Sequence, residues 1–263
     1  MSASIRPNWV ADLPRKTGVA IILVAFALVA LRFGGIALWV LASVAGVLMM
    51  AEWAGLAGAT PQHKRLALFA VSVPLAILSP LAAGPNFFAL GLMGAAGFFI
   101  VIQTRNRQLA WGVPYVVLPI TALLALRMLP NGELLTLWAL ASVWATDIGA
   151  YFAGRLIGGP KLMPRLSPNK TWAGLGGGMV AALLVGLAFA RWGGVPMLLA
   201  LGGPLWAVVA QAGDLFESGL KRQAGVKDSG DLLPGHGGVL DRLDGVVPVL
   251  PLVVLVLEAM RLA

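Results

Sequence analysis

Acidic residues are scarce in this chain, and most of them lie near its C-terminal end. The 263 residues include eleven Asp and Glu, and six of these lie between Asp214 and Asp244. Carboxylates that gather at one surface repel one another unless cations neutralise them, and hard divalent ions prefer oxygen ligands. We therefore expect Asp214, Asp241 and Asp244 to lie close to a Mg²⁺ ion, with a second cation possible.

Basic and glycine-rich segments surround these carboxylates. Lys221-Arg222 and Lys227 precede Pro234-Gly-His-Gly-Gly238, which is followed by Asp241-Arg242. Glycine lets backbone N–H groups close around an anion, and a following helix points its positive end at the same place. The simpler alternative is a basic loop that only touches lipid headgroups. The interleaved carboxylates favour a phosphate and metal site, because acidic groups beside an anion are unfavourable unless a cation bridges them.

The spacing of Asp241 and Asp244 places both on one helical face if a helix begins there. In that position they contact metal or substrate, or they serve only as first-turn charges favoured by the helix dipole at about 0.3 to 1 kcal/mol each.

A second polar segment runs from Asp147 to Trp172. Asp147 and Tyr151 share a helix face, and Asp147 lies deep enough to need a cation or a basic partner at the interface. Ser167-Pro168 also fits the start of a helix, so part of this segment has a capping alternative. Lys170 has no evident structural task, and the glycines at 174 and 176–178 favour close helix packing.

The elements that carry these residues are predicted to be membrane helices. Hydrophobic residues make up 59% of the chain and charged residues 11%, with a mean hydropathy of +0.88. Each apolar stretch is long enough to cross a hydrocarbon core roughly 30 Å thick. We predict an all-α, polytopic transmembrane bundle forming one integral membrane domain over 1–263. Its nine helices are expected at about 17–33, 36–54, 66–83, 88–103, 112–129, 134–154, 172–190, 196–216 and 240–262.

The distribution of Lys and Arg predicts the orientation of this bundle. Placing the N-terminus in the cytoplasm puts 15 of the 19 basic residues on that side, leaving Arg32, Arg127, Arg191 and Arg261 outside. This asymmetry is typical of membrane proteins, so the net charge of +8 indicates orientation rather than a nucleic acid partner. The polar segments 154–171 and 217–239 are then cytoplasmic connections. The chain has no cysteine, which excludes thiolate chemistry.

The C-terminal motif resembles the signature of the phosphatidate cytidylyltransferase (CDP-diacylglycerol synthase) family. It reads Ser218-Gly-Leu-Lys221-Arg222, then Lys227-Asp228, then Leu233-Pro-Gly-His236-Gly-Gly238-Val-Leu-Asp241-Arg242-Leu-Asp244, a span of 27 residues. Gly213-Asp214-Leu-Phe-Glu-Ser218 and the block from Asp147 to Trp172 are also similar to that family. The family string that ends in Lys-Thr-Trp often continues with Glu-Gly, whereas Ala173-Gly174 follows here, so no duty of that glutamate carries over.

The resemblance implies a metal-dependent enzyme that condenses CTP with phosphatidic acid into CDP-diacylglycerol and pyrophosphate. It implies Asp214 and Asp241 as metal ligands and Asp228 and Asp244 as supporting carboxylates. Phosphate contacts would come from Lys221, Arg222, Lys227 and Arg242, and substrate or loop positioning from Ser218, His236, Gly237 and Gly238. Asp147, Tyr151, Ser167 and Lys170 would complete the pocket. The catalytic half would be 134–263, while residues 1–130 match only in hydropathy. We expect a bacterial inner membrane protein whose active site faces the cytoplasm, in contact with membrane lipid and able to form a homodimer.

Two other functions remain open at this stage. A secondary transporter or channel would also place carboxylates such as Asp147 and Asp214 within the membrane. The polar residues gather at one face, and the chain lacks an internal inverted repeat, which disfavours transport. A CTP-dependent lipid kinase of the polyprenol or dolichol type would share a nucleotide and metal site, but would transfer a γ-phosphoryl group to an alcohol.

Overall fold

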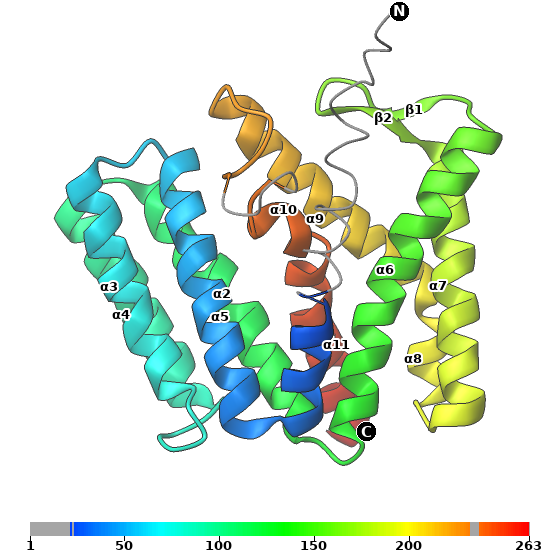
Figure 1. The fold of residues 1–263 in the computed structure, drawn as a ribbon, viewed down its shortest axis with the longest axis horizontal. Helices are drawn as coiled ribbons and strands as arrows, with labels where there is room; N and C mark the ends of the chain where they lie inside the picture. The colour runs from blue at the N-terminus through cyan, green and yellow to red at the C-terminus, as the bar shows by residue number, and fades with distance from the viewer. Residues whose placement is uncertain (1–21, 23, 232–236, 263) are drawn as a thin grey trace, which may run out of the picture.

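The computed structural model describes residues 22, 24–231 and 237–262, and it consists almost entirely of helices (Figure 1). A helix over Val24–Phe33 comes first. The long helices that follow are α2 (Gly35–Leu56), α3 (Pro61–Ile77), α4 (Phe87–Thr104), α5 (Arg107–Met128), α6 (Gly132–Leu156), α7 (Trp172–Gly193), α9 (Gly203–Gln223) and α11 (Val246–Leu262), with two short ones, α8 (Met197–Leu201) and α10 (Leu240–Leu243).

Five of the described helices are long and apolar enough to cross a membrane, namely α2, α4, α5, α6 and α7. The prediction of an all-α integral membrane protein is therefore confirmed. Nine spans and a cytoplasmic N-terminus stay predictions. In Figure 1 the hairpin after α6 and the C-terminal end of α9 lie at one end of the bundle, and the C-terminus lies toward the other.

Several predicted helix boundaries were wrong, and two of the differences concern candidate site residues. The helix expected over 196–216 is broken at Gly202 into α8 and α9, and α9 continues to Gln223. Lys221 and Arg222 therefore belong to the last turn of a helix rather than to a connection. The helix expected over 240–262 is interrupted after α10 by Asp244 and Gly245, because α11 begins only at Val246.

The segment between α6 and α7 forms a small antiparallel hairpin of β1 (Lys161–Met163) and β2 (Ser167–Thr171). Ser167 pairs with Met163 inside this hairpin, so the alternative in which Ser167-Pro168 begins a helix was wrong. The residue that caps α7 is Thr171, whose hydroxyl oxygen accepts the N–H of Gly174 at 3.0 Å. The hairpin thus ends where α7 begins, which fixes the place of Lys170 next to the helix.

Glycines let α6 and α7 pack backbone to backbone, as the sequence predicted for positions 174 and 176–178. A Cβ atom at Gly178 would lie 2.9 Å from the carbonyl oxygen of Thr146, and one at Gly177 would lie 2.7 Å from that of Gly149. Only Gly176 in this group faces open space. This packing holds the C-terminal part of α6, including Asp147, against the start of α7.

The core joins the two halves of the chain. One cluster of buried apolar residues contains side chains of α2, α3, α4 and α5 together with Leu220, Leu240 and Val247. A second cluster packs α6 and α11 around Trp138 and Trp206, whose rings meet edge to face. α9 and α11 therefore pack against helices from both halves, and α9 runs through the middle of the bundle (Figure 1).

Candidate active site

α9 presents three different faces to its surroundings. Gly213, Phe216 and Leu220 line an apolar cavity, whereas Gln211 and Asp214 line a polar one. Glu217 and Lys221 are one turn apart on the third side, which faces α10. Because these positions repeat at three- and four-residue intervals, each set forms its own stripe on the helix.

The polar cavity, of about 610 Å³, lies between α6, α7, α9 and β2. Asp214 is bound there by two neighbours. Lys170 of β2 forms an ion pair with its Oδ2, and the hydroxyl of Ser218 donates to its Oδ1 at 3.3 Å. Lys170 therefore does have a partner that its sequence context did not reveal. The residues that line this cavity also include Asp147, Tyr151, Arg155, Asn169 and Gln211.

Tyr151 lies beside Arg155 at the C-terminal end of α6. The Arg155 guanidinium donates to the Tyr151 hydroxyl at 3.1 Å, and both side chains are exposed at the cavity. Asp147, one turn earlier, lines the same cavity. The structure thus brings together four of the predicted site residues, namely Asp147, Tyr151, Lys170 and Asp214. Ser167 lies at the start of β2 and is not part of the cavity lining.

Asp241 is the centre of a second cluster, formed by the signature motif. Its Oδ1 lies 2.6 Å from Nζ of Lys221, and its Oδ2 accepts hydrogen bonds from the Ser229 N–H at 2.9 Å and the Gly238 N–H at 2.8 Å. The Ser229 hydroxyl also lies 2.9 Å from Oδ2. Burial would raise the pKa of Asp241, but the hydrogen bonds from Lys221, Gly238 and Ser229 outweigh it and lower the pKa to about 2.

The glycine-rich run therefore holds an anion of the chain itself. Gly237 has a φ of +80°, which favours glycine, and a Cβ atom there would lie 2.8 Å from Oδ2 of Asp241. At the next residue, Gly238, the backbone N–H donates to that carboxylate. The loop was predicted to close its N–H groups on a phosphate; in this structure the Gly238 N–H donates to Asp241, and phosphate binding stays a prediction.

Asp244 lies between the two clusters, at the break between α10 and α11. Its Oδ1 accepts the N–H of Gly245 at 2.7 Å. Burial, together with the nearby carboxylates of Asp214 and Asp147, raises the pKa of Asp244 to about 7 against the opposing Gly245 hydrogen bond. Gly213 makes this closeness possible, because a Cβ atom there would collide with the backbone of Asp244.

The remaining signature residues lie on the exposed side of this region. Arg222, Lys227, Asp228 and Arg242 are all exposed, and Arg222 donates to the carbonyl oxygen of Val226 at 3.4 Å. His236 lies outside the described residues. The exposed cations border the loop that holds Asp241, where an incoming polyanion would meet them.

No preformed metal cluster of three or more His, Cys, Asp or Glu side chains exists within residues 22, 24–231 and 237–262. Both oxygens of Asp241 are engaged, by Lys221 on one side and by Ser229 and Gly238 on the other. Mg²⁺ in phosphoryl and nucleotidyl sites is commonly held by one or two carboxylates, several waters and the substrate phosphates. The oxygens of Asp214 are also engaged, by Lys170 and Ser218, but Asp214 lines an open polar cavity and lies near Asp244, which is the setting that this mode requires.

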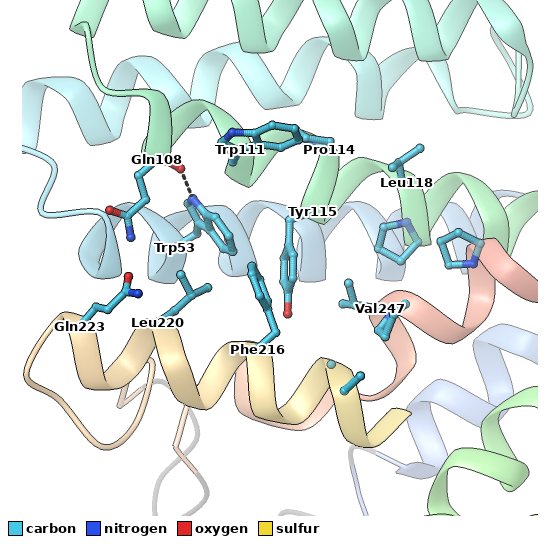
Figure 2. Close-up of a pocket in the computed structure, with 15 residues that line it drawn as sticks. Trp53, Gln108, Trp111, Pro114, Tyr115, Leu118, Phe216, Leu220, Gln223 and Val247 are labelled. Atoms are coloured by element: carbon cyan, nitrogen blue, oxygen red, sulfur yellow. Dashed lines mark hydrogen bonds between the residues drawn. The ribbon is translucent and has the colours of Figure 1, made fainter. Parts of the chain in front are cut away.

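The apolar cavity on the other side of α9 measures about 980 Å³ (Figure 2). Rings of Trp53, Tyr115 and Phe216 pack together at its centre, with centroids 4.7 to 6.5 Å apart. The indole N–H of Trp53 donates to the carbonyl oxygen of Gln108 at 2.8 Å, and Figure 2 shows Tyr115 with its hydroxyl directed toward α9. Gly213 and Phe216 therefore face the apolar cavity, while Asp214, the residue after Gly213, faces the polar cavity.

Three residues of this region were not singled out from the sequence. Two of them, Glu217 and Ser229, lie within the motif region. The fully buried Glu217 accepts a hydrogen bond from the ammonium group of Lys221 at 3.1 Å. The third is Glu52 of α2, which contacts the loop between α9 and α10. We call this part of the motif, which includes Ser229 and Gly238, the signature loop. The signal of Glu52 was available, because a carboxylate inside an otherwise apolar span indicates a function by default.

Comparison with known proteins agrees with the motif. The sequence model of the Cytidylyltransferase family matches residues 15–260. The chain belongs to this family. A phosphatidate cytidylyltransferase from Brucella suis biovar 1 is 41% identical over 227 residues, covering 81% of this chain and 82% of the relative. One from Pseudomonas aeruginosa is 36% identical over 216 residues, covering 76% and 80%, and one from Staphylococcus epidermidis is 50% identical over 119 residues, covering 44% and 46%.

The family match extends over residues 15–260, so it includes the N-terminal helices that were expected to match only in hydropathy. The resemblance read from the motif is confirmed. The roles of individual site residues and the need for magnesium stay predictions, which the geometry described above makes more specific.

Proposed function

We propose that this cytidylyltransferase family member joins CTP and phosphatidic acid to give CDP-diacylglycerol and pyrophosphate. The observation that supports this best is the position of α9 between a polar cavity and an apolar cavity. A phosphatidate molecule has a dianionic head and two acyl chains, so its enzyme must offer both environments side by side. The names of the relatives from Brucella suis and Pseudomonas aeruginosa point to the same reaction.

The reaction depends on charge neutralisation more than on general-base catalysis. An oxygen of the lipid phosphate attacks the α-phosphorus of CTP, a new P–O bond forms, and the bond to the β-phosphate breaks to release pyrophosphate. A phosphate monoester has its second pKa near 6, so the nucleophile is already largely ionised at neutral pH. Positioned cations then stabilise the charge that develops as two polyanions meet.

In this proposal Lys170 and Arg155 contact phosphate in the polar cavity, and Arg222, Lys227 and Arg242 guide the nucleotide from the exposed side. The Lys221–Asp241 pair orders the loop between them. Asp214, with Asp244 nearby, would hold Mg²⁺. The ion would supply positive charge that offsets the charge of the phosphates. One or two carboxylates are sufficient for Mg²⁺ in sites of this kind.

We place the acyl chains of phosphatidic acid in the apolar cavity. Its lining is almost wholly apolar, and several of its side chains are exposed at the outer surface of the bundle, including Trp111 at 68% and Phe216 at 51%. In a membrane such a surface meets lipid, so a chain can enter from the side without crossing water. Each buried CH₂ group contributes roughly 0.8 kcal/mol relative to water, so the cavity can also select between chain lengths.

The proposed location is a bacterial cytoplasmic membrane, with the end of the bundle that carries the hairpin and the signature loop facing the cytoplasm. Positive charge on that end supports this orientation, and CTP is a cytoplasmic substrate. A homodimer is compatible with this proposal.

The deciding experiment uses the purified full-length chain in mixed micelles with α-³²P-labelled CTP, phosphatidic acid and Mg²⁺. We expect label in a lipid that comigrates with CDP-diacylglycerol, stoichiometric release of pyrophosphate, and loss of both with excess EDTA. A parallel reaction with γ-³²P-labelled CTP and polyprenol tests the kinase alternative. Label transferred from the γ position to an alcohol, with none from the α position to phosphatidic acid, would overturn the proposal.

A further inference from the structure

Glu52 of α2 is a carboxylate buried in a membrane-spanning helix, and its hydrogen-bond donors come from the other half of the chain. The side chain is only 9% exposed. Its Oε1 accepts the N–H of Val239 at 2.9 Å, and its Oε2 accepts the N–H of Leu240 at 2.9 Å. Burying a carboxylate is costly unless such donors satisfy it, so this contact needs a reason.

The loop is shaped to admit this carboxylate. A Cβ atom at Gly238 would collide with the Glu52 carboxylate and with the hydroxyl of Ser229, and one at Gly230 would lie 3.0 Å from Cγ of Glu52. Glycine at both positions leaves the space that the Glu52 side chain occupies. Glu52 thus enters between the two ends of the loop, next to residue 230 on one side and residues 238–240 on the other.

A single hydroxyl connects Glu52 to the signature cluster. The Ser229 hydroxyl lies 3.0 Å from Oε2 of Glu52 and 2.9 Å from Oδ2 of Asp241. Backbone N–H groups of the same loop divide between the two acids, with Ser229 and Gly238 donating to Asp241 and the next two residues donating to Glu52. The two carboxylates therefore bind neighbouring groups of the same loop.

We propose that Glu52 is a positioning residue for the reaction, which fixes the signature loop so that Asp241 and Lys221 are placed for catalysis. The role rests on the proposed function. Among the described residues, the hydrogen bonds to the Glu52 carboxylate all come from groups of this loop, so Glu52 acts through the loop. A displacement of about 1 Å far from the reacting atoms can cost roughly 100-fold in rate, so a misplaced loop is sufficient to impair catalysis.

The chemistry of the carboxylate predicts which substitutions fail. Both oxygens of Glu52 accept hydrogen bonds, whereas an amide has one accepting oxygen and an NH₂ group that only donates. Glu52→Gln would therefore set an NH₂ group against a backbone N–H of Val239 or Leu240. Glu52→Asp keeps two accepting oxygens but is shorter by one CH₂ group, so it should restore part of what the amide loses.

The kinetic test compares the wild-type chain, Glu52→Gln, Glu52→Asp and the control Glu258→Gln. Glu258 makes an exposed i, i+3 pair with Arg261 at 3.0 Å, far from the loop, so it provides the same chemical change without the contact. We expect kcat/KM for CTP to fall roughly 10- to 100-fold in Glu52→Gln, to recover in part in Glu52→Asp, and to remain near the wild-type value in Glu258→Gln.

A second measurement follows the loop directly. The chain has no cysteine, so Asp231→Cys, at an exposed loop position beside the Glu52 contact, supplies a single labelling site for maleimide. We expect the labelling rate in membranes to rise several-fold when Glu52→Gln is added and to stay unchanged with Glu258→Gln. This readout does not depend on turnover, so it still reports on Glu52 if the wild-type chain fails to make CDP-diacylglycerol and the proposed function falls.

The proposal is overturned if Glu52→Gln keeps kcat/KM and the labelling rate within twofold of wild type. It is also overturned if activity falls while the labelling rate is unchanged, since the loop would then be intact. Loss of the folded, monodisperse protein in both Glu52→Gln and Glu52→Asp would show a general structural role instead, and that result counts against positioning as well.

Discussion

Lys221 Nζ lies 2.6 Å from Oδ1 of Asp241, and both side chains are largely buried, at 13% and 8% exposure. The pair joins the end of α9 to α10 across the signature loop. The pair bears on the predicted roles of both residues, because Asp241 was expected to bind metal and Lys221 to bind phosphate. In this structure each neutralises the other, whereas Asp147 and Asp214 line the open polar cavity, where Lys170 pairs with Asp214.

Replacing Asp241 by Asn should abolish most turnover. The amide has only one accepting oxygen, so it loses the hydrogen bond either from Lys221 or from the two loop N–H groups. Because the amide is neutral, Glu217 remains the anionic partner of Lys221. We expect kcat/KM to fall by roughly 100-fold or more, as when a preorganised electrostatic contact is removed. Asp231→Asn, in the same loop and exposed, is the control. Wild-type turnover in Asp241→Asn would remove Asp241 from the site.

Lys170→Met should impair the polar cavity specifically. The substitution leaves Asp214 without its ion-pair partner and removes a positive charge from the cavity where we place the phosphates. We expect kcat/KM for CTP to fall about 10- to 1,000-fold, the range seen when single charge-stabilising groups are removed. Lys161→Met, an exposed residue of β1 in the same hairpin, should keep the wild-type value. Equal kinetics for the two variants would leave Lys170 with only a structural role.

The low pKa of Asp241 predicts how stability depends on pH. A carboxylate whose pKa drops from 3.8 to about 2 on folding stabilises the folded state above about pH 4, and that contribution is lost as the pH falls toward 2. Thermal unfolding of the metal-free protein, followed by tryptophan fluorescence, should show a higher Tm for wild type than for Asp241→Asn at pH 5. The difference should shrink steadily between pH 4 and pH 2. A constant difference over that range would contradict the hydrogen-bond network around Asp241.

Gly177→Ala should destabilise the contact between α6 and α7. The added methyl group would meet Ala153 and the carbonyl oxygen of Gly149, and overpacking of this kind typically costs about 1 to 3 kcal/mol. Gly176→Ala is a matched control, because its methyl group would meet open space and alanine favours a helix by up to about 1 kcal/mol. Unfolding titrations in detergent measure both changes. Destabilisation of similar size at the two positions would argue against close packing through Gly177.

Filling the apolar cavity should change the preference for acyl chains. Leu118 lines this cavity from α5, and Leu118→Trp would occupy space that we assign to a chain. Losing room for two CH₂ groups corresponds to roughly 1.6 kcal/mol, or about a 10-fold increase in KM. We expect that increase for dioleoyl phosphatidic acid but not for a dihexanoyl substrate. Leu205→Trp, at an exposed position of α9 outside the cavity, controls for the bulk of tryptophan. Equal effects on both substrates would place the chains elsewhere.

Hydropathy and motif spacing were sufficient to predict the membrane class and the family, because both depend on local sequence. Apolar stretches of the right length define spans, and about a dozen fixed positions between Ser218 and Asp244 identify the signature. The glycines that join α6 to α7 were also predictable, since small residues at short spacing are typical of close helix packing.

The pairing of the charged residues was not predictable, because it depends on contacts between distant segments. Lys170 and Asp214 are 44 positions apart, and neither sequence context indicates the other. The hairpin was missed for a different reason, since β1 and β2 have only three and five residues and show no clear alternation. The partners of Glu52 were not predictable either, because they lie 177 to 188 positions further along the chain.

The bonds of Glu52 also have a consequence for biogenesis. Its donors lie 177 to 188 residues further along the chain, so α2 enters the bilayer long before Ser229, Val239 and Leu240 have been synthesised. During that interval the carboxylate lacks the donors that satisfy it in the folded protein. The contact between Glu52 and this loop can therefore form only after residue 240 has been synthesised, so α2 receives these hydrogen bonds late in the synthesis of the chain.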